Sequence, residues 1–547
     1  MYRALLSLCA LALAACEPSG RCRAAHCGTL VFVTVAEPST LNPALSTTAE
    51  ERDVHDLVFE KLADVGPGLV TVGDTGFVPQ LAESWAREDS VTLVFQLHPD
   101  ARWHDGEPVR AEDVVFSWTT YTDPDTPSGV GANLQHITSV TARDPGTVVV
   151  RFARPYGAQF YDAVYHMRIL PSHLLEATAR SAWADMPFAR NPIGSGPYRF
   201  VRWDAGERIV LESWQEHYRG APRVARLVFR PVGSFEAIVA ALAAGDADAT
   251  EVMMFGPLRD RLLATPHLSA VEFDSPAYGF LAFNARSPDD TASRHPILSD
   301  VRVRRALVMA VDREAVVQAV LGDLGRPAVG PHTRLQWIWR DDLPHLPYDT
   351  ITAASLLADA GWVDRDGDGV RDRGRIPLRL RVNSLSTSAL RHGFALLVQD
   401  AWRKIGVDAV LDEVDPATRG DRDQRGDFDV TFGAWAVDPD PSGVRQLWTP
   451  SGFGAGNWWR YDSPEYADLV DRAMLAPDPG RARELWHASI AHINNDAPAL
   501  FLYELTQVAW VHTRVKDSRV RPDSWWALVP SWRIDPRAAL PRDMVEP

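Results

Sequence analysis

Short apolar runs rich in β-branched residues alternate along the chain with stretches of helical periodicity. Residues 30–35 (LVFVTV) predict a buried strand, because the run is continuous and is followed by the turn residues Glu37, Pro38 and Ser39. Apolar residues recur every three or four positions over 53–63, which predicts a helix. The same patterns predict strands at 91–97, 147–152, 227–231, 278–283 and 499–505, and helices at 235–244, 301–320, 352–360, 390–405 and 481–493. This order predicts an α/β or α+β protein rather than a repeat array or a sandwich.

Composition narrows the class of protein. The chain has 547 residues, 46% of them hydrophobic and 23% charged, which is the balance of an ordinary globular protein. At roughly 150 residues per domain, this length predicts about three or four folding units. The formal net charge of −16 argues against nucleic acid as a partner, because phosphate-binding surfaces are normally basic. Only three of the 56 basic residues are lysines: Lys61, Lys404 and Lys516.

The four cysteines, at positions 9, 16, 22 and 27, all lie near the N-terminus. Their absence from the rest of the chain excludes a zinc ribbon or a thiol nucleophile there. Arg3 precedes an apolar run over 5–15 that is long enough for secretion but too short to span a bilayer. The tetrad Leu13-Ala14-Ala15-Cys16 resembles the lipobox of bacterial lipoproteins. That resemblance implies a signal peptide at 1–15, a lipid on Cys16 and a tether at 16–28; a plain signal peptide is the alternative.

Export changes what is expected of the last two cysteines. Cys22 and Cys27 would lie in an oxidising compartment, where a disulfide closing a small loop can persist. Two free thiols are the alternative, and the spacing does not decide between them. Such a loop lies outside the predicted domains and would add little to their stability.

Common catalytic and metal-binding motifs are absent from the sequence. Residues 191–198 (NPIGSGPY) lack the strand-turn-helix context of a nucleophile elbow, and there is no His-Glu-x-x-His, phosphate loop or dinucleotide fingerprint. Asp364, Asp366 and Asp368 resemble the start of a calcium loop, but Arg375 occupies the twelfth position, where the loop needs a glutamate. A solvated turn is therefore favoured over a bound cation. We expect neither enzymatic activity nor a cofactor or metal site.

Several segments, in order along residues 29–510, resemble the peptide/nickel family of ABC-transporter solute-binding proteins. The segments are PQLAESW (79–85), WHDGEPV (103–109), AEDVVFS (111–117), GSGPY (194–198), DVRVRRAL (300–307), AVDR (310–313), AGW (360–362), residues 399–406 and DPDP (438–441).

The resemblance implies a fold. It implies an α/β protein of the two-lobed periplasmic binding protein type, type II-like, with an extra subdomain inserted in the first lobe. By similarity, the first lobe comprises 29–50, 193–283 and 500–547, the inserted subdomain 51–192, and the second lobe 284–499.

The resemblance also implies a function. It implies an extracytoplasmic substrate-binding lipoprotein, in the periplasm or cell envelope, that binds peptides in the cleft between the lobes and delivers them to ABC permease subunits. It would be a monomer held to a membrane by lipid. A non-peptide ligand such as a nickel chelate, an oligosaccharide or an opine, or a role as a sensor lipoprotein, are alternatives.

Candidate ligand-binding residues follow from the same resemblance. Asp438 is expected to pair with the α-amine of a peptide, unless it caps the turn before Pro439. Trp435 and Trp458 are candidates for the cleft wall. Tyr278, Phe280 and Asn284 are further candidates, with core packing as their alternative. No Lys or Arg matches a family position for binding the ligand carboxylate.

Overall fold

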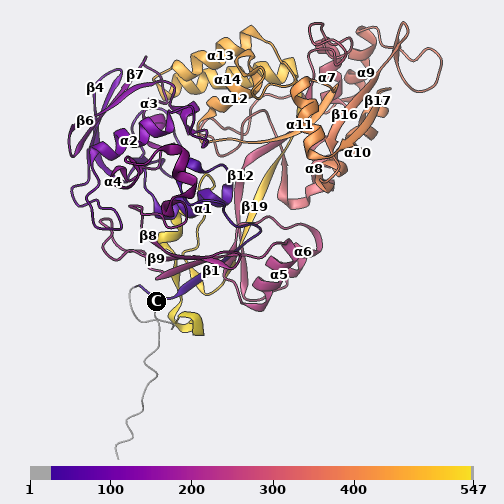
Figure 1. Ribbon diagram of the computed structural model, residues 1–547. Coiled ribbons are helices and arrows are strands. Elements are labelled where there is room, and N and C mark those ends of the chain that lie inside the picture. Colours follow the sequence, from indigo (N-terminus) through magenta and orange to yellow (C-terminus); the bar gives the residue numbers. More distant parts are fainter. Residues whose placement is uncertain (1–25, 544–547) are drawn as a thin grey trace, which may run out of the picture.

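The computed structural model describes residues 26–543 (Figure 1). The predicted signal peptide, Cys16 and Cys22 lie outside these residues. Cys27 is disulfide-bonded, and because it is the last cysteine its partner lies outside the described residues too, so its pairing with Cys22 stays a prediction. No helix within 26–543 is both long and apolar enough to cross a membrane.

A large mixed sheet runs through the whole molecule. Its strands lie in the order β17-β16-β18-β12-β19-β11-β1-β10-β9-β8, with β13 beside β19. Their bounds are β1 (Thr29–Thr34), β8 (Tyr198–Asp204), β9 (Arg208–Ser213), β10 (Arg226–Pro231), β11 (Ala249–Thr250), β12 (Leu268–Phe283), β13 (Gly325–Pro327), β16 (Arg379–Leu385), β17 (Asp408–Val414), β18 (Val430–Ala436) and β19 (Ala499–His512).

The long strands β12 and β19 join the two ends of this sheet. They pair antiparallel, from Leu268 opposite His512 to Ala282 opposite Ala499, with a register shift between Asp274 and Tyr278. One end carries the parallel strands β1, β10 and β11, and the other carries the parallel strands β16, β17 and β18. The fold is therefore the expected two-lobed α/β fold, with β12 and β19 crossing between the lobes (Figure 1).

A second sheet enlarges the first lobe. It has the order β4-β5-β7-β6 and is accompanied by α2 (Ala111–Tyr121), α3 (Gln159–Val164) and α4 (Ser172–Leu175). The strands are β4 (Ala82–Asp89), β5 (Thr92–Leu97), β6 (Ile137–Asp144) and β7 (Thr147–Phe152). Side chains of this subdomain and of β1, β9 and β10 form one continuous apolar core. The inserted subdomain is therefore packed firmly onto the first lobe.

Helices complete both lobes. In the first lobe, α5 (Phe235–Ala244) and α6 (Gly256–Leu263) cover the outer side of β1 and β19. In the second lobe, two apolar clusters lie on opposite faces of the sheet. Its helices are α7 (Val301–Met309), α8 (Arg313–Leu321), α9 (Thr350–Asp359), α10 (Ala389–Arg403), α11 (Pro416–Arg425), α12 (Val444–Trp448), α13 (Pro464–Leu475) and α14 (Pro479–Asp496).

Most predicted elements are present, and the differences have local causes. The predicted strand 147–152 and helix 235–244 coincide with β7 and α5. The helix predicted over 301–320 is instead the pair α7 and α8, because Asp312 accepts a hydrogen bond from the backbone N–H of Ala315 and starts a new helix. The helix predicted at 53–63 is α1 (Ala49–Val58), which begins at a capping box formed by Thr48 and Glu51.

The predicted lobe boundaries remain a proposal, with one adjustment. The boundary predicted between residues 50 and 51 falls inside α1, a helix that contacts β8 and the C-terminal 3-10 helix η8 (Trp525–Ser531). We propose that the inserted subdomain begins after this helix.

A buried carboxyl group lies where the lobes join. Glu504 on β19 is 3% exposed and is paired in register with Tyr278 of β12 and Arg326 of β13. Its Oε2 accepts a hydrogen bond of 3.0 Å from the N–H of Arg334, whereas its Oε1 has no partner among residues 26–543. Burial raises the pKa of Glu504 to about 7.

We expect Glu504 to make the protein less stable at alkaline pH. Between pH 4.5 and 7 the folded state binds more protons at this residue than the unfolded state, so the free energy of unfolding falls as the pH rises, by roughly 3 kcal/mol at this site. Urea unfolding at pH 5 and pH 8 should show that Glu504→Gln removes this loss, whereas the exposed control Glu83→Gln keeps it. Equal pH dependence in all three proteins would contradict the assignment.

Candidate ligand-binding site

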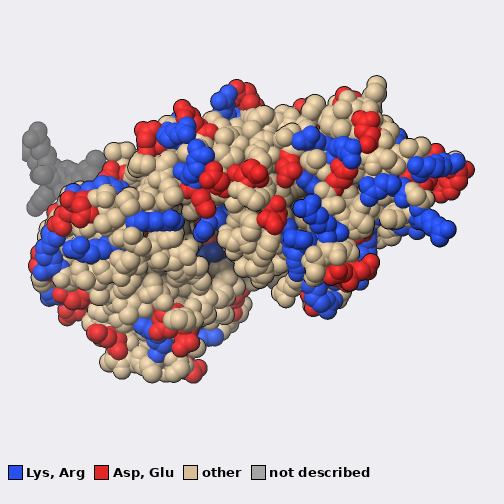
Figure 2. All heavy atoms as spheres, turned by 90° about the horizontal axis from the view of Figure 1, so that it is seen from above, with Lys and Arg blue, Asp and Glu red and all other residues tan. Residues whose placement is uncertain are grey.

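The parallel strands of the two lobes indicate where a ligand binds. In open α/β sheets, ligands bind beyond the carboxyl ends of parallel strands. The carboxyl end of β11 in the first lobe leads to Glu251, and that of β18 in the second lobe leads to Asp438. Seen from above, the surface is hollowed between the two halves of the molecule (Figure 2).

Asp438 is exposed just beyond β18. Its backbone carbonyl accepts a 3.0 Å hydrogen bond from Gln336, but its carboxylate has no hydrogen bond or ion pair within residues 26–543. The cap of the following turn is Asp440, which accepts a hydrogen bond of 2.9 Å from the N–H of Ser442. The capping alternative for Asp438 is therefore wrong, and its carboxylate is available to a ligand.

Two tyrosines of the inserted subdomain lie within electrostatic range of Asp438. The rings of Tyr161 and Tyr165 stack, with centroids 4.6 Å apart. Burial, with the charges of Asp523 and Asp438, raises the pKa of Tyr165 well above its ordinary value. Burial and the neighbouring Tyr165 and Asp438 do the same for Tyr161. Asp438 thus lies close enough to this aromatic pair for its charge to act on both hydroxyls.

A network of charged side chains contacts Tyr165. Its hydroxyl donates a 3.3 Å hydrogen bond to Asp523. Arg521 pairs with Asp523 at 2.7 Å and with Asp64 at 2.9 Å. Burial alone would lower the pKa of Arg521, but these two carboxylates hold it above its ordinary value. The ammonium of Lys61 lies 4.0 Å from the centre of the Tyr165 ring.

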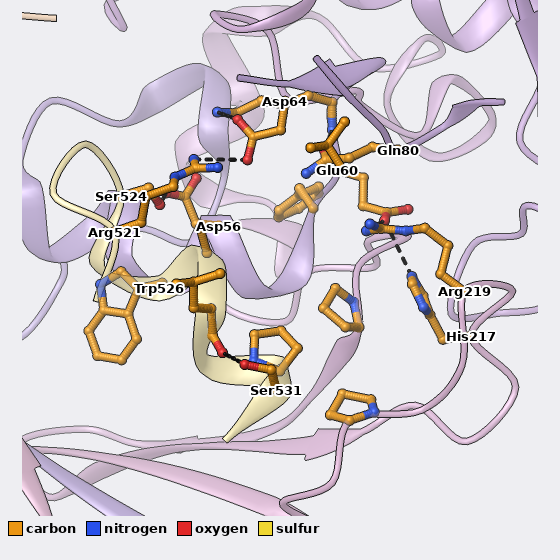
Figure 3. A pocket seen from close by; sticks show the side chains of 18 of the residues that line it. Asp56, Glu60, Asp64, Gln80, His217, Arg219, Arg521, Ser524, Trp526 and Ser531 are labelled. Carbon is orange, nitrogen blue, oxygen red and sulfur yellow. Dashed lines mark hydrogen bonds and ion pairs between the residues drawn. The ribbon is translucent and has the colours of Figure 1, made fainter. Parts of the chain in front are cut away.

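A cavity of about 460 Å³ adjoins this network (Figure 3). Asp64, Arg521 and Trp526 lie on one side of it, and Glu60, His217 and Arg219 on the other. Glu60 is buried and accepts hydrogen bonds from Tyr218 at 3.0 Å and from Arg219. Burial would raise the pKa of Glu60, but the charge of Arg219 and the contact with His217 lower it. Most charged groups that line the cavity are therefore already paired.

The inserted subdomain also contacts the second lobe directly. The hydroxyl of Thr71 donates a 2.7 Å hydrogen bond to the buried carboxylate of Asp440 and accepts one of 3.1 Å from the indole of Trp337. The N–H of Gly157 donates to the carbonyl of Met474 at 3.0 Å. Burial raises the pKa of Asp440. These contacts hold the two sides of the cleft together beside Asp438.

Three residues predicted for the cleft belong to the core instead. Tyr278 is fully buried and its hydroxyl accepts a hydrogen bond of 3.0 Å from Trp448. Phe280 packs edge-on against Trp448, and Asn284 donates hydrogen bonds to the carbonyls of residues 426 and 428. The reason is that both faces of this part of β12 are covered by apolar clusters, which leaves no face for a ligand.

The two predicted tryptophans, Trp435 and Trp458, are only partly buried, so both remain candidates for the cleft wall. Trp435, on β18 three residues before Asp438, is half-buried and packs against the cluster that contains Phe280. Trp458 is also half-buried, whereas its neighbour Trp459 is a core residue. A place for Trp435 and Trp458 in the cleft wall stays a prediction.

The acidic loop at residues 364–369 forms an exposed turn. The carboxylate of Asp364 accepts hydrogen bonds from the backbone N–H groups of Gly367 at 2.7 Å and Gly369 at 3.0 Å. The carboxylates of Asp364, Asp366 and Asp368 lie within 4.8 Å of one another. The turn lies in the second lobe, between α9 and β16.

The key site residues beyond Asp438 are not apparent in the sequence. Tyr161 and Tyr165 have a helical i, i+4 spacing that also suits a core face. Lys61 stands out only because lysine is rare in this chain. Their proximity depends on the packing of the inserted subdomain against the C-terminal segment, which no local pattern predicts.

The model of the bacterial extracellular solute-binding proteins, family 5, matches residues 76–456 of the chain. The chain belongs to this family. Over 492 residues it is 26% identical to the oligopeptide-binding protein AppA of Bacillus subtilis, an alignment that covers 87% of this chain and 86% of that protein. It is 25% identical to the dipeptide-binding protein of Escherichia coli over 520 residues, with 90% and 92% covered.

A solved structure agrees with these sequence relatives. NikZ from Campylobacter jejuni, solved in complex with Ni(L-His), superposes with a TM-score of 0.75 at 25% identity and covers 92% of this chain and 99% of that chain. The resemblance inferred from the motifs is confirmed, and this family member is a solute-binding protein of two lobes.

We expect substitutions at Asp438 and Asp440 to differ in their effect on stability. Asp440→Ala removes a cap and leaves the Thr71 hydroxyl unpaired, and should lower the free energy of unfolding by roughly 1–3 kcal/mol. Asp438→Ala removes an exposed carboxylate and should change it by less than about 0.5 kcal/mol. Urea denaturation of the ligand-free proteins measures both values. If both variants lose a similar amount of unfolding free energy, Asp438 has a structural role, which contradicts this prediction.

Proposed function

We propose that this protein is the extracytoplasmic binding component of an ABC importer, which takes up peptides between its lobes and delivers them as a monomer to permease subunits. The observation that carries the proposal is the unpaired carboxylate of Asp438, which is exposed just beyond the carboxyl end of β18 and lies within electrostatic range of the tyrosine pair of the inserted subdomain. The names of the relatives, an oligopeptide-binding and a dipeptide-binding protein, support the choice of ligand.

A peptide has chemical needs that such a cleft can meet. Its charged amine is costly to bury unless it is paired, and Asp438 offers the pairing charge. Its backbone groups need hydrogen bonds, and its varied side chains need broad walls that aromatic residues supply. Tyr165 and Trp435, which are both half-buried, are suited to that role.

A nickel chelate is the second candidate ligand. NikZ, with which the chain shares its fold and 25% identity, is solved with Ni(L-His). The amine of a histidine chelate is a nickel ligand and offers no free ammonium to Asp438, so the unpaired carboxylate favours the peptide. Mass spectrometry of the ligand released from natively purified protein distinguishes a peptide from a chelate, an oligosaccharide or an opine. A signalling role would instead show in the absence of any importer phenotype when the gene is deleted.

We expect Asp438 to bind the α-amine of the peptide. Asp438→Ala should weaken peptide binding by roughly 2–5 kcal/mol, because it leaves a desolvated ammonium unpaired. N-acetylation of the peptide should cause a similar loss in the wild type and little further loss in the variant, since both changes remove the same contact. Calorimetric titration measures all four combinations, with the exposed Asp359→Ala as the control. Additive losses would rule out this contact.

Anchoring through Cys16 belongs to the same proposal. A lipid on Cys16 would leave about ten residues before the described chain begins at His26, a reach of roughly 35 Å at most. The protein would then work in the periplasm or cell envelope, close to a membrane that holds its permease.

We expect Cys16→Ser to move the protein from the membrane fraction to the soluble fraction, because a single serine cannot carry the lipid. Cys22→Ser is the matched control, since it changes a cysteine of the same segment outside the lipobox. Fractionation followed by immunoblotting measures the distribution. Membrane association of Cys16→Ser at the wild-type level would exclude the lipid anchor.

A further inference from the structure

The ammonium of Lys61 makes no hydrogen bond to another residue within 26–543. The residue is 8% exposed and lies between α1 and β2 (Ala63–Asp64). The closest carboxylate oxygen, Oδ1 of Asp64, is 3.8 Å away, beyond hydrogen-bond range. Within residues 26–543 no other carboxylate lies close enough to form an ion pair with it. The ammonium is not among the fully enclosed polar atoms, so it keeps contact with solvent, and its N–H donors bond to no protein acceptor within residues 26–543.

The neighbouring carboxylates are occupied by other groups. Oδ1 of Asp64 accepts a 2.9 Å hydrogen bond from the N–H of Val65, and its Oδ2 pairs with Arg521 at 2.9 Å. Asp523 pairs with the same arginine and accepts from Tyr165. Lys61 cannot gain a full partner without breaking these contacts.

The backbone holds Lys61 in place. Its N–H donates to the side-chain carbonyl of Gln80 at 2.9 Å, and its carbonyl accepts from the N–H of Leu81 at 3.1 Å. The ring of Tyr165 covers the ammonium at 4.0 Å. A cation fixed in this way is pre-organised to receive an anion, with little side-chain entropy left to lose.

Lys61 also lines the cavity of about 460 Å³ shown in Figure 3, a size typical of small-molecule sites. Much of its wall is apolar, with Phe59, Val65 and Trp526 among the lining residues. Of the other lining cations, Arg219 and Arg521 are in ion pairs and Arg223 is exposed. Among the described residues that line the cavity, Lys61 is thus a mostly buried cation whose ammonium makes no hydrogen bond to the protein.

We propose that Lys61 binds the α-carboxylate of the ligand and that the adjoining cavity receives the side chain of its carboxyl-terminal residue. This inference rests on the proposed function, because it takes Asp438 as the amine site. Lys61 lies against the ring of Tyr165, and the charge of Asp438 acts on the hydroxyl of the same tyrosine, so both proposed anchors lie in the neighbourhood of this side chain. The apolar wall favours a peptide that ends in a large apolar residue.

The test compares the peptide Ala-Phe with its carboxyl-terminal amide by calorimetric titration. The wild type should bind the acid about 10- to 100-fold more tightly than the amide, the range for a hydrogen bond to a charged group. Lys61→Met should weaken binding of the acid by a similar factor and leave the amide unchanged, because the two changes remove one contact. Lys404→Met, at a side chain 68% exposed, is the matched control and should bind both peptides like the wild type.

Each outcome supports or overturns a defined statement. Equal affinity of the wild type for acid and amide overturns the role of Lys61, and needs no variant that might fold poorly. Equal weakening of acid and amide by Lys61→Met overturns it too, because that pattern belongs to a structural role. If Ala-Ala binds as tightly as Ala-Phe, the cavity does not receive the carboxyl-terminal side chain, whereas the role of Lys61 is unaffected. If no member of a peptide mixture binds the wild type, the proposed function fails, and the subsite with it.

Discussion

The pairing of β12 with β19 is the constraint on which the rest of the structure depends. These strands are the covalent and hydrogen-bonded link between the lobes, and each contributes apolar side chains to the core clusters of both. Backbone groups of the ladder pair between the two strands and with β11, β13 and β18, without a ligand. The register shift between Asp274 and Tyr278 falls where the ladder passes from one lobe to the other, and the buried carboxyl of Glu504 lies at the same level. Where the lobes meet, the ladder therefore has both a register shift and a buried carboxyl group, Glu504, of which only one oxygen is hydrogen-bonded.

Several buried charged groups beside the cleft and the cavity are held by other residues before any ligand arrives. Arg521 bridges Asp64 and Asp523, Glu60 is held by Arg219, and Asp440 accepts from Thr71. Isolated buried charge is costly, so this pairing is what allows the inserted subdomain and the C-terminal segment to pack together. Two charged groups differ from these paired ones. Within residues 26–543, the exposed carboxylate of Asp438 has no partner, and the ammonium of the mostly buried Lys61 makes no hydrogen bond to the protein.

The sequence predicts the elements well and the site poorly, for a physical reason. Apolar periodicity reports which residues are buried, and so β7 and α5 are found where they were expected. Periodicity does not say what buries them, and for this reason Tyr278 and Phe280 were assigned to a cleft although helices and loops of the second lobe cover them. The motif that contains Asp438 identifies a residue that is free in the structure. Lys61 and Tyr165 carry no such signal, because they meet only when segments about a hundred residues apart pack together.

Lys61 and Asp438, the two proposed anchors, differ in exposure, and this difference predicts the order in which the ends of the ligand bind. Lys61 is fixed against the inserted subdomain and the first lobe, so it can take up a carboxylate without motion of the second lobe. Asp438 lies on the second lobe and is hydrated while the cleft is open, so its pairing with an amine gains strength only as closure removes water from between them. In the proposed order of steps, Lys61 first binds the carboxyl end of the ligand, and pairing of the amine with Asp438 then stabilises the closed state. A ligand that lacks the amine would bind to the first lobe but would not favour the closed state, since a ligand shifts a conformational equilibrium only through its different affinity for the two states. Selectivity for complete peptides would then arise in the closing step rather than in the first encounter.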